Sequence, residues 1–91
     1  MLLNISPDAL KAFLESNEDC EMLSEGEYVA DLFMLDEPLT VNLRLEKDGC
    51  AILAAAKLLF DEEQDGWYMG DRIEDEGEIL KAFETAMREE K

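Results

Sequence analysis

The sequence contains no histidine, and only two of its 91 residues are cysteine. Cys20 and Cys50 do not form a CxxC pair. Zinc sites, catalytic triads and general bases depend largely on these two residue types, so their scarcity argues against a zinc site and against histidine-based catalysis. We expect two reduced, partly buried thiols in preference to a disulfide or a reactive cysteine.

Basic residues are also scarce, with 8 lysines and arginines against 24 acidic residues and a net charge of −16. Binding to DNA, RNA or an anionic membrane begins with neutralisation of phosphates by lysine and arginine. The charge therefore argues against direct nucleic-acid and membrane binding. It favours a basic or nucleic-acid-binding protein as the partner.

Long apolar runs are missing as well. The opening Met1-Leu2-Leu3-Asn4-Ile5 is too short for a signal peptide and lacks a basic n-region. No run approaches the roughly 20 apolar residues of a membrane span. We expect a cytoplasmic protein.

The first recognisable element is a helix over residues 7–16. Ser6 is placed to cap it, and Pro7 suits the first helical position. Leu10, Phe13 and Leu14 form one apolar stripe, which predicts packing of this face against a core. Residues 17–26 follow neither the helical nor the strand period of apolar residues, and they are interpreted as a loop or a continuation of the helix.

Apolar runs separated by turn residues then predict strands. Residues 27–35 are rich in β-favouring side chains and end before Pro38. Residues 39–45 alternate strictly between apolar and polar, as in a strand with one buried face. Asp48-Gly49 and Asp65-Gly66 are strong signals for tight hairpin turns.

Residues 50–60 are ambiguous because their alanines, leucines and lysine also favour a helix. The flanking Asp-Gly turns favour a strand. Its predicted inner face is Cys50, Ile52, Ala54, Ala56, Leu58 and Phe60. A last strand is predicted over residues 66–73, with Trp67, Met69 and Ile73 on one face and Tyr68 and Arg72 on the other.

A second helix follows, because Asp75 and Glu78 resemble a capping box and apolar residues recur at helical spacing up to Met87. The predicted fold class is α+β. Residues 1–91 form a single small domain, in which an antiparallel β-meander of three to four strands is flanked by an N-terminal and a C-terminal helix. The element order is α-β-β-β-β-α, with both helices on one face of the sheet.

Two kinds of chemistry fit the sequence poorly. Asp61, Glu63, Asp65 and Gly66 match the first half of an EF-hand, but Arg72 stands where a bidentate glutamate is required. A solvated hairpin loop is the better interpretation. Carboxylate pairs are expected by chance among so many acids, and no nucleophile motif accompanies them. We therefore predict no enzyme activity, no catalytic residues, no metal and no cofactor.

The acids themselves suggest phosphate mimicry. Carboxylates two residues apart on a strand or four apart on a helix are spaced by about 6–7 Å, close to the phosphate repeat of a nucleic acid. The net charge also exceeds the magnitude of about 2–8 that solubility requires. The predicted partner-binding residues are Glu62, Glu63, Asp65, Trp67, Tyr68, Asp71, Glu74, Asp75, Glu76 and Glu78.

An apolar interaction surface is a further candidate. Tyr28, Phe33, Trp67, Tyr68 and Met69 include residues on both faces of the predicted strands, and two short helices are not expected to cover both faces. An uncovered patch would indicate a homodimer or a peptide groove. The alternative is that these aromatic residues complete the core.

In size, acidity and mixed αβ make-up, the chain resembles the small inhibitors of phages and mobile elements, such as anti-CRISPR, anti-restriction and DNA-mimic proteins. This resemblance implies an inhibitor that blocks a positively charged groove. Leu43-x-Leu45-x-x-Asp48-Gly49-Cys50-x-Ile52 is similar to the strand-turn-strand region of acidic secretion chaperones, although the later strands and helix of those proteins are missing. That resemblance implies the alternative function, a small non-enzymatic chaperone or adaptor acting as a dimer.

Overall fold

The computed structural model describes residues 2–3 and 5–89. These residues form six antiparallel strands and two helices. In chain order the elements are β1 (Leu2–Leu3), α1 (Pro7–Ser16), β2 (Cys20–Ser24), β3 (Glu27–Leu32), β4 (Leu39–Glu46), β5 (Gly49–Asp61), β6 (Gly66–Arg72) and α2 (Glu76–Glu89). The predicted α+β class is confirmed. The sheet has more strands than expected, because β2 and the two-residue β1 were not predicted.

The sheet is a meander in which strands β2 to β5 lie beside one another in sequence order. Strand β5 is 13 residues long. One of its edges pairs with β4, and the other pairs with β1 near Cys50 and with β6 beyond Ala56. The prediction of a strand rather than a helix over residues 50–60 is therefore confirmed.

Helix α1 has the predicted bounds. The Ser6 hydroxyl accepts a hydrogen bond from the Ala9 amide at 3.3 Å and so satisfies one of the unpaired N–H groups of the first turn. Leu10, Phe13 and Leu14 are buried, as the apolar stripe predicted.

Strand β2 replaces the loop or helix continuation predicted for residues 17–26. It is the edge strand that pairs with β3, and Gly26, with φ of 80°, lies in the turn between them. Most of its side chains are exposed, including Met22 and Leu23. A strand with no buried face leaves no alternating pattern in the sequence, which explains why it was missed.

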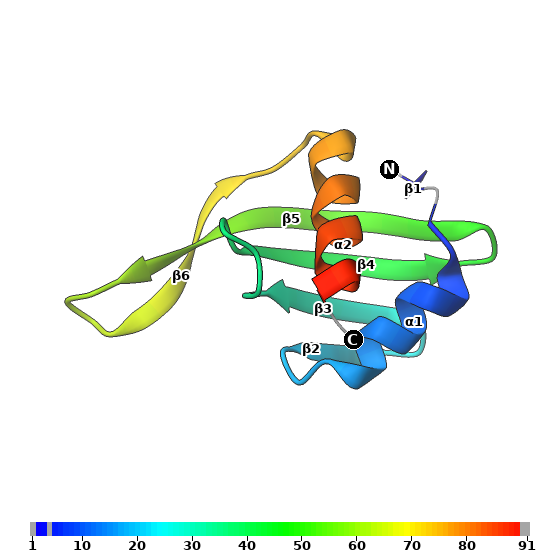
Figure 1. Cartoon of the computed structure of the whole chain (residues 1–91), viewed down its shortest axis with the longest axis horizontal. Coiled ribbons are helices and arrows are strands. Elements are labelled where there is room, and N and C mark those ends of the chain that lie inside the picture. Colours follow the sequence, from blue (N-terminus) through cyan, green and yellow to red (C-terminus); the bar gives the residue numbers. More distant parts are fainter. Residues whose placement is uncertain (1, 4, 90–91) are drawn as a thin grey trace.

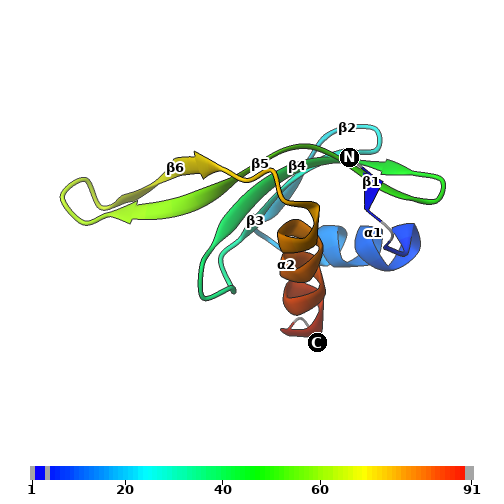
Figure 2. The same ribbon diagram turned by 90° about the horizontal axis from the view of Figure 1, so that it is seen from above.

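Both helices pack against the same face of the sheet, as predicted (Figure 2). The core lies between them and the sheet. Its largest fully buried side chains are Phe83, Leu10, Leu14, Leu32, Leu43, Ile79, Val41 and Cys50. We call the opposite side of the sheet, which neither helix covers, the open face.

The predicted inner face of β5 is wrong beyond Ile52. Asn42 pairs with Ala54 and Leu43 pairs with Ile52, so Leu53 is an extra residue in a β-bulge. An extra residue reverses the alternation of all later side chains. Ala55 is therefore on the core side, opposite Val41, whereas Ala54 and Ala56 lie on the open face with Asn42 and Thr40.

A second bulge separates the two ends of β6. Ala56 pairs with Arg72 but Leu58 pairs with Met69, which leaves Gly70 and Asp71 opposite one residue of β5. Ile73 consequently enters the core, while Trp67 and Met69 lie on the open face with Arg72. The predicted grouping of Ile73 with Trp67 and Met69 is thus wrong.

Strand β3 also ends three residues earlier than predicted, at Leu32, because residues 33–38 form the connection to β4.

The outer half of β5 and β6 form a hairpin that extends beyond the rest of the sheet (Figure 1). It gives the described molecule an elongated shape, with principal extents of 43 × 26 × 25 Å. This hairpin, which we call the projecting hairpin, carries five of the predicted partner-binding residues at or near its tip.

Candidate protein-binding surface

The predicted acidic residues lie in two groups at opposite ends of β6. The hairpin-tip carboxylates are Glu62, Glu63 and Asp65. The helix-start carboxylates are Asp71, Glu74, Asp75, Glu76 and Glu78. Seven strand residues span about 23 Å at 3.3 Å per residue. The fold therefore presents two separate acidic clusters.

The turn at the hairpin tip is held by Asp61. Its carboxylate accepts hydrogen bonds from the amides of Glu63 at 2.9 Å and Gln64 at 3.4 Å. Asp65 has φ of 53°, the left-handed conformation that such turns require and that aspartate tolerates. Asp61 thus has a structural role, while the three hairpin-tip carboxylates are exposed to solvent. The residues form a strand-to-strand hairpin, as predicted in preference to an EF-hand.

The helix-start carboxylates also include one structural residue. The Asp75 carboxylate accepts hydrogen bonds from the amides of Gly77 at 2.9 Å and Glu78 at 3.3 Å, and it caps α2 as the sequence predicted. The other four carboxylates are exposed. Glu76 and Glu78 lie in the first turn of α2, where the positive end of the helix macrodipole stabilises their negative charge.

The two predicted aromatic anchors point to opposite faces of the projecting hairpin, because they are consecutive residues of β6. Trp67 contacts Phe33 and Phe60, with ring centroids 5.1 and 5.3 Å apart, and remains 47% exposed. Tyr68 lies opposite Leu59 and is 51% exposed. The cluster of Trp67, Phe33 and Phe60 lies on the side of the open face.

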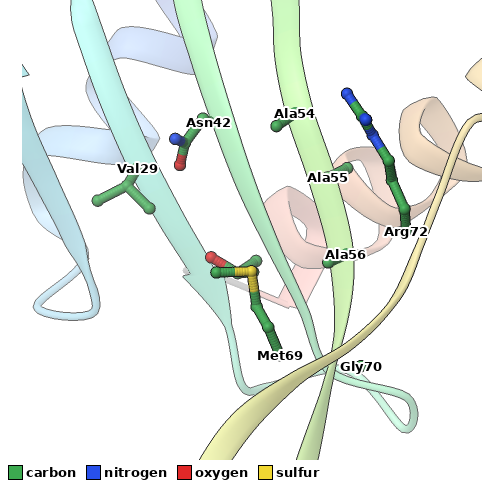
Figure 3. Close-up of a pocket in the computed structure, with 9 residues that line it drawn as sticks. Val29, Asn42, Ala54, Ala55, Ala56, Met69, Gly70 and Arg72 are labelled. Atoms are coloured by element: carbon green, nitrogen blue, oxygen red, sulfur yellow. The ribbon is translucent and has the colours of Figure 1, made fainter.

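A shallow groove on the open face was not predicted from the sequence. It has a volume of about 320 Å³ and is lined by Val29, Thr40, Asn42, Ala54, Ala55, Ala56, Met69, Gly70 and Arg72. Figure 3 shows Met69 and Arg72 on either side of the alanines of β5. Met69 is 70% exposed, the largest value among the exposed large apolar residues of the described chain. The groove was missed because its floor depends on the bulge at Leu53, which turns Ala54 and Ala56 outward.

The two cysteines are separated by the width of the sheet. Cys20 is on β2 and Cys50 on β5, with β3 and β4 between them. Three strand spacings of about 4.8 Å place them too far apart for a disulfide. Burial raises the pKa of the Cys50 thiol to about 11, which makes it a poor nucleophile. Within residues 2–3 and 5–89, no group of three or more Cys, Asp or Glu side chains is arranged to hold a metal ion.

Neither helix in the described part of the chain has the length and apolar character needed to cross a membrane. Comparison of the chain with models of protein families, with curated proteins and with solved structures found no match.

Proposed function

We propose that this protein is a non-enzymatic acidic inhibitor that binds a nucleic-acid-binding protein and blocks its positively charged groove. The observation that carries the proposal is the projecting hairpin (Figure 1). It holds exposed carboxylates at its tip and exposed aromatic side chains behind them. A narrow acidic arm of this kind enters a groove that normally holds a phosphate backbone. In this mode of action the protein resembles phage-encoded inhibitors of the anti-CRISPR or anti-restriction type.

The charge balance supports this mechanism. Within the described residues two ion pairs form, Lys11 with Glu15 at 4.0 Å and Arg44 with Glu46 at 2.9 Å. Most carboxylates in that part of the chain are therefore left to interact with solvent or with a partner. A net charge of −16 accelerates encounter with a basic protein, and the apolar side chains of the hairpin then slow dissociation.

The cytoplasm is the proposed compartment, because nucleic-acid-handling proteins work there and both cysteines are thiols.

Capture experiments with two variants of equal charge test the proposal. One removes the hairpin-tip carboxylates (Glu62→Gln, Glu63→Gln, Asp65→Asn), and the other removes three exposed acids near β2 (Glu18→Gln, Glu21→Gln, Glu25→Gln). Each is immobilised and exposed to an extract of the native host. We expect proteins that are retained by the wild type and the β2-side variant, lost with the tip variant, and released by added duplex DNA or RNA.

Equal retention by all three chains would contradict the hairpin tip as the contact. A third variant (Asp71→Asn, Glu74→Gln, Glu76→Gln) tests the helix-start carboxylates separately. It leaves Asp75 in place, because loss of that cap would weaken α2 and confuse a folding defect with a binding defect.

The uncovered open face favours a second candidate function, a small adaptor or chaperone that presents its sheet to a client protein and works as a dimer. Exposed Phe60, Trp67 and Met69 are the observation that supports it. Light scattering separates the two proposals. A monomer that competes with nucleic acid for a basic protein favours the inhibitor, and a stable dimer favours the adaptor.

A further inference from the structure

The groove on the open face is one part of a longer apolar strip. Leu58, Phe60, Trp67 and Met69 alternate along the two strands of the projecting hairpin so that they share one face. Val29 continues the strip onto β3, across the alanine floor of Ala54 and Ala56. The strip therefore runs from the middle of the sheet to the hairpin. We call it the apolar strip.

The width of the groove favours an α-helix as its occupant. Its lining residues come from β3, β4, β5 and β6, which are adjacent in the sheet. Three strand spacings of about 4.8 Å give a width of roughly 14 Å. An α-helix with its side chains is about 10–12 Å wide, so one helix fits across these strands, whereas a single extended segment would fill only part of the width.

The sizes of the lining side chains also favour an α-helix as the occupant. Ala54 and Ala56 form a low floor, and the taller Met69 stands beside it. Small side chains on a sheet leave room for a helix to approach closely. Met69 is unbranched and adapts its shape to an incoming apolar side chain.

The charge around the strip selects the composition of the occupant. The strip itself has no carboxylate. Acidic residues outnumber basic ones along its borders, where Arg44 lies opposite Glu27 and Arg72 lines the groove. Glu27 and Asp31 flank Val29 along the open face of β3, and the hairpin-tip carboxylates lie beyond Trp67. This arrangement of an apolar centre with a charged rim complements a segment that has apolar side chains in its middle and lysine or arginine at its borders.

We propose that the apolar strip binds an amphipathic basic helix of the partner protein, with its apolar face over Ala54 and Ala56 and its cations towards the acidic borders. The inference rests on the proposed function, since it specifies which part of a basic protein is bound. Arg72 is exposed and lines one side of the groove. In the proposed complex its aliphatic stem adds to the apolar contact while its guanidinium stays in solvent.

The probe for this proposal is a synthetic peptide of about 18 residues, made of leucine and lysine, with leucines at i, i+3, i+4 and i+7. Two control peptides of identical composition are used. In one, the order is scrambled so that no apolar face forms, and in the other, leucine and lysine alternate as in a strand. We expect the amphipathic helical peptide to bind about tenfold or more tightly than either control. The scrambled peptide forms no apolar face, and the alternating peptide, although it has an apolar face as a strand, covers only part of the width of the groove.

Protein variants then locate the contact. Ala54→Gln fills the groove at an exposed position without changing the charge. We expect it to lower affinity for the helical peptide about tenfold and to leave affinity for the scrambled peptide unchanged. Leu53→Gln is the matched control, because the neighbouring Leu53 is also exposed but does not line the groove. Amide NMR shifts on peptide addition should concentrate at Val29, Asn42, Ala54 and Met69.

The outcomes separate this inference from the proposed function. Equal binding of the scrambled peptide, tighter binding of the alternating peptide, or no effect of Ala54→Gln would overturn the helix site. The tip variant reports on the proposed function independently, because it should weaken the retention of natural partners whether or not the groove binds a helix. If binding of the helical peptide depends on Ala54 but the tip variant still retains the natural partners, the groove is supported and the hairpin tip is overturned as the contact.

Discussion

Some carboxylates in this protein accept hydrogen bonds that support the fold, and others face solvent without such a bond. Asp61 and Asp75 accept hydrogen bonds from backbone amides at the start of a turn and of a helix. Asp31 accepts a hydrogen bond from the Thr40 hydroxyl at 2.6 Å, across the β3–β4 pair. Because substitution of these residues would change stability, only the remaining acids are suitable for testing the role of charge in binding.

Cys50 provides a prediction about pH. Its thiol has a pKa near 9.0 in the unfolded chain and about 11 in the folded protein, because burial disfavours the thiolate. The contribution of the buried thiol to the free energy of unfolding is therefore complete below pH 9 and is lost as the pH rises from 9 to 11. The expected slope from this one group is at most about 1.4 kcal/mol per pH unit.

Urea unfolding of the wild type and Cys50→Ala at about pH 8 and 10 measures this effect. The variant is expected to be less stable at the lower pH, because it leaves a small cavity, but to lose less stability on going to the higher pH. The same decline in both proteins would show that Cys50 does not control it. Slow alkylation of Cys50 in the folded protein provides an independent check.

At the scale of the elements, the start of α2 depends on Asp75. Asp75→Ala removes the acceptor of two backbone hydrogen bonds and should lower the free energy of unfolding by about 1 kcal/mol. Asp75→Asn keeps an oxygen acceptor while removing the charge. Glu76→Gln removes a charge at a position that does not cap the helix. Both controls are expected to stay within about 0.5 kcal/mol of wild type in urea unfolding.

An equal loss in Asp75→Asn and Asp75→Ala would contradict the capping explanation. It would attribute the effect to the charge at the positive end of α2.

The elements also show which features were predictable from the sequence. Helix α1 and strand β4 were predictable, because each has one buried face and therefore a clear period in its apolar residues. Strand β2 was not, since it is an exposed edge. The open-face groove and the inward position of Ile73 were not predictable either, because each depends on a bulge that is set by pairing with another strand. For the same reason, the separation of the two acidic clusters follows from the projecting hairpin and not from local spacing.

At the scale of the whole molecule, like charges oppose the folded state. A net charge of −16 within a radius of gyration of 12.6 Å places many carboxylates within the Debye length of about 30 Å at 10 mM salt. We expect the melting midpoint to rise between about 10 mM and 0.5 M NaCl, where screening shortens that length several-fold. A midpoint that falls over this range in a thermal scan would indicate that attractive pairs dominate.

The order of the strands also has a consequence for how the chain reaches this fold. From β2 to β6, every strand pairs with the next one in sequence, so each pairing closes only a short loop. Short loops cost little chain entropy, and folds rich in such local contacts form quickly. Two other contacts join distant parts of the chain: β1 pairs with β5, and α2 packs on the face of the sheet that α1 also covers. The meander can therefore assemble hairpin by hairpin, with the two ends of the chain joining last.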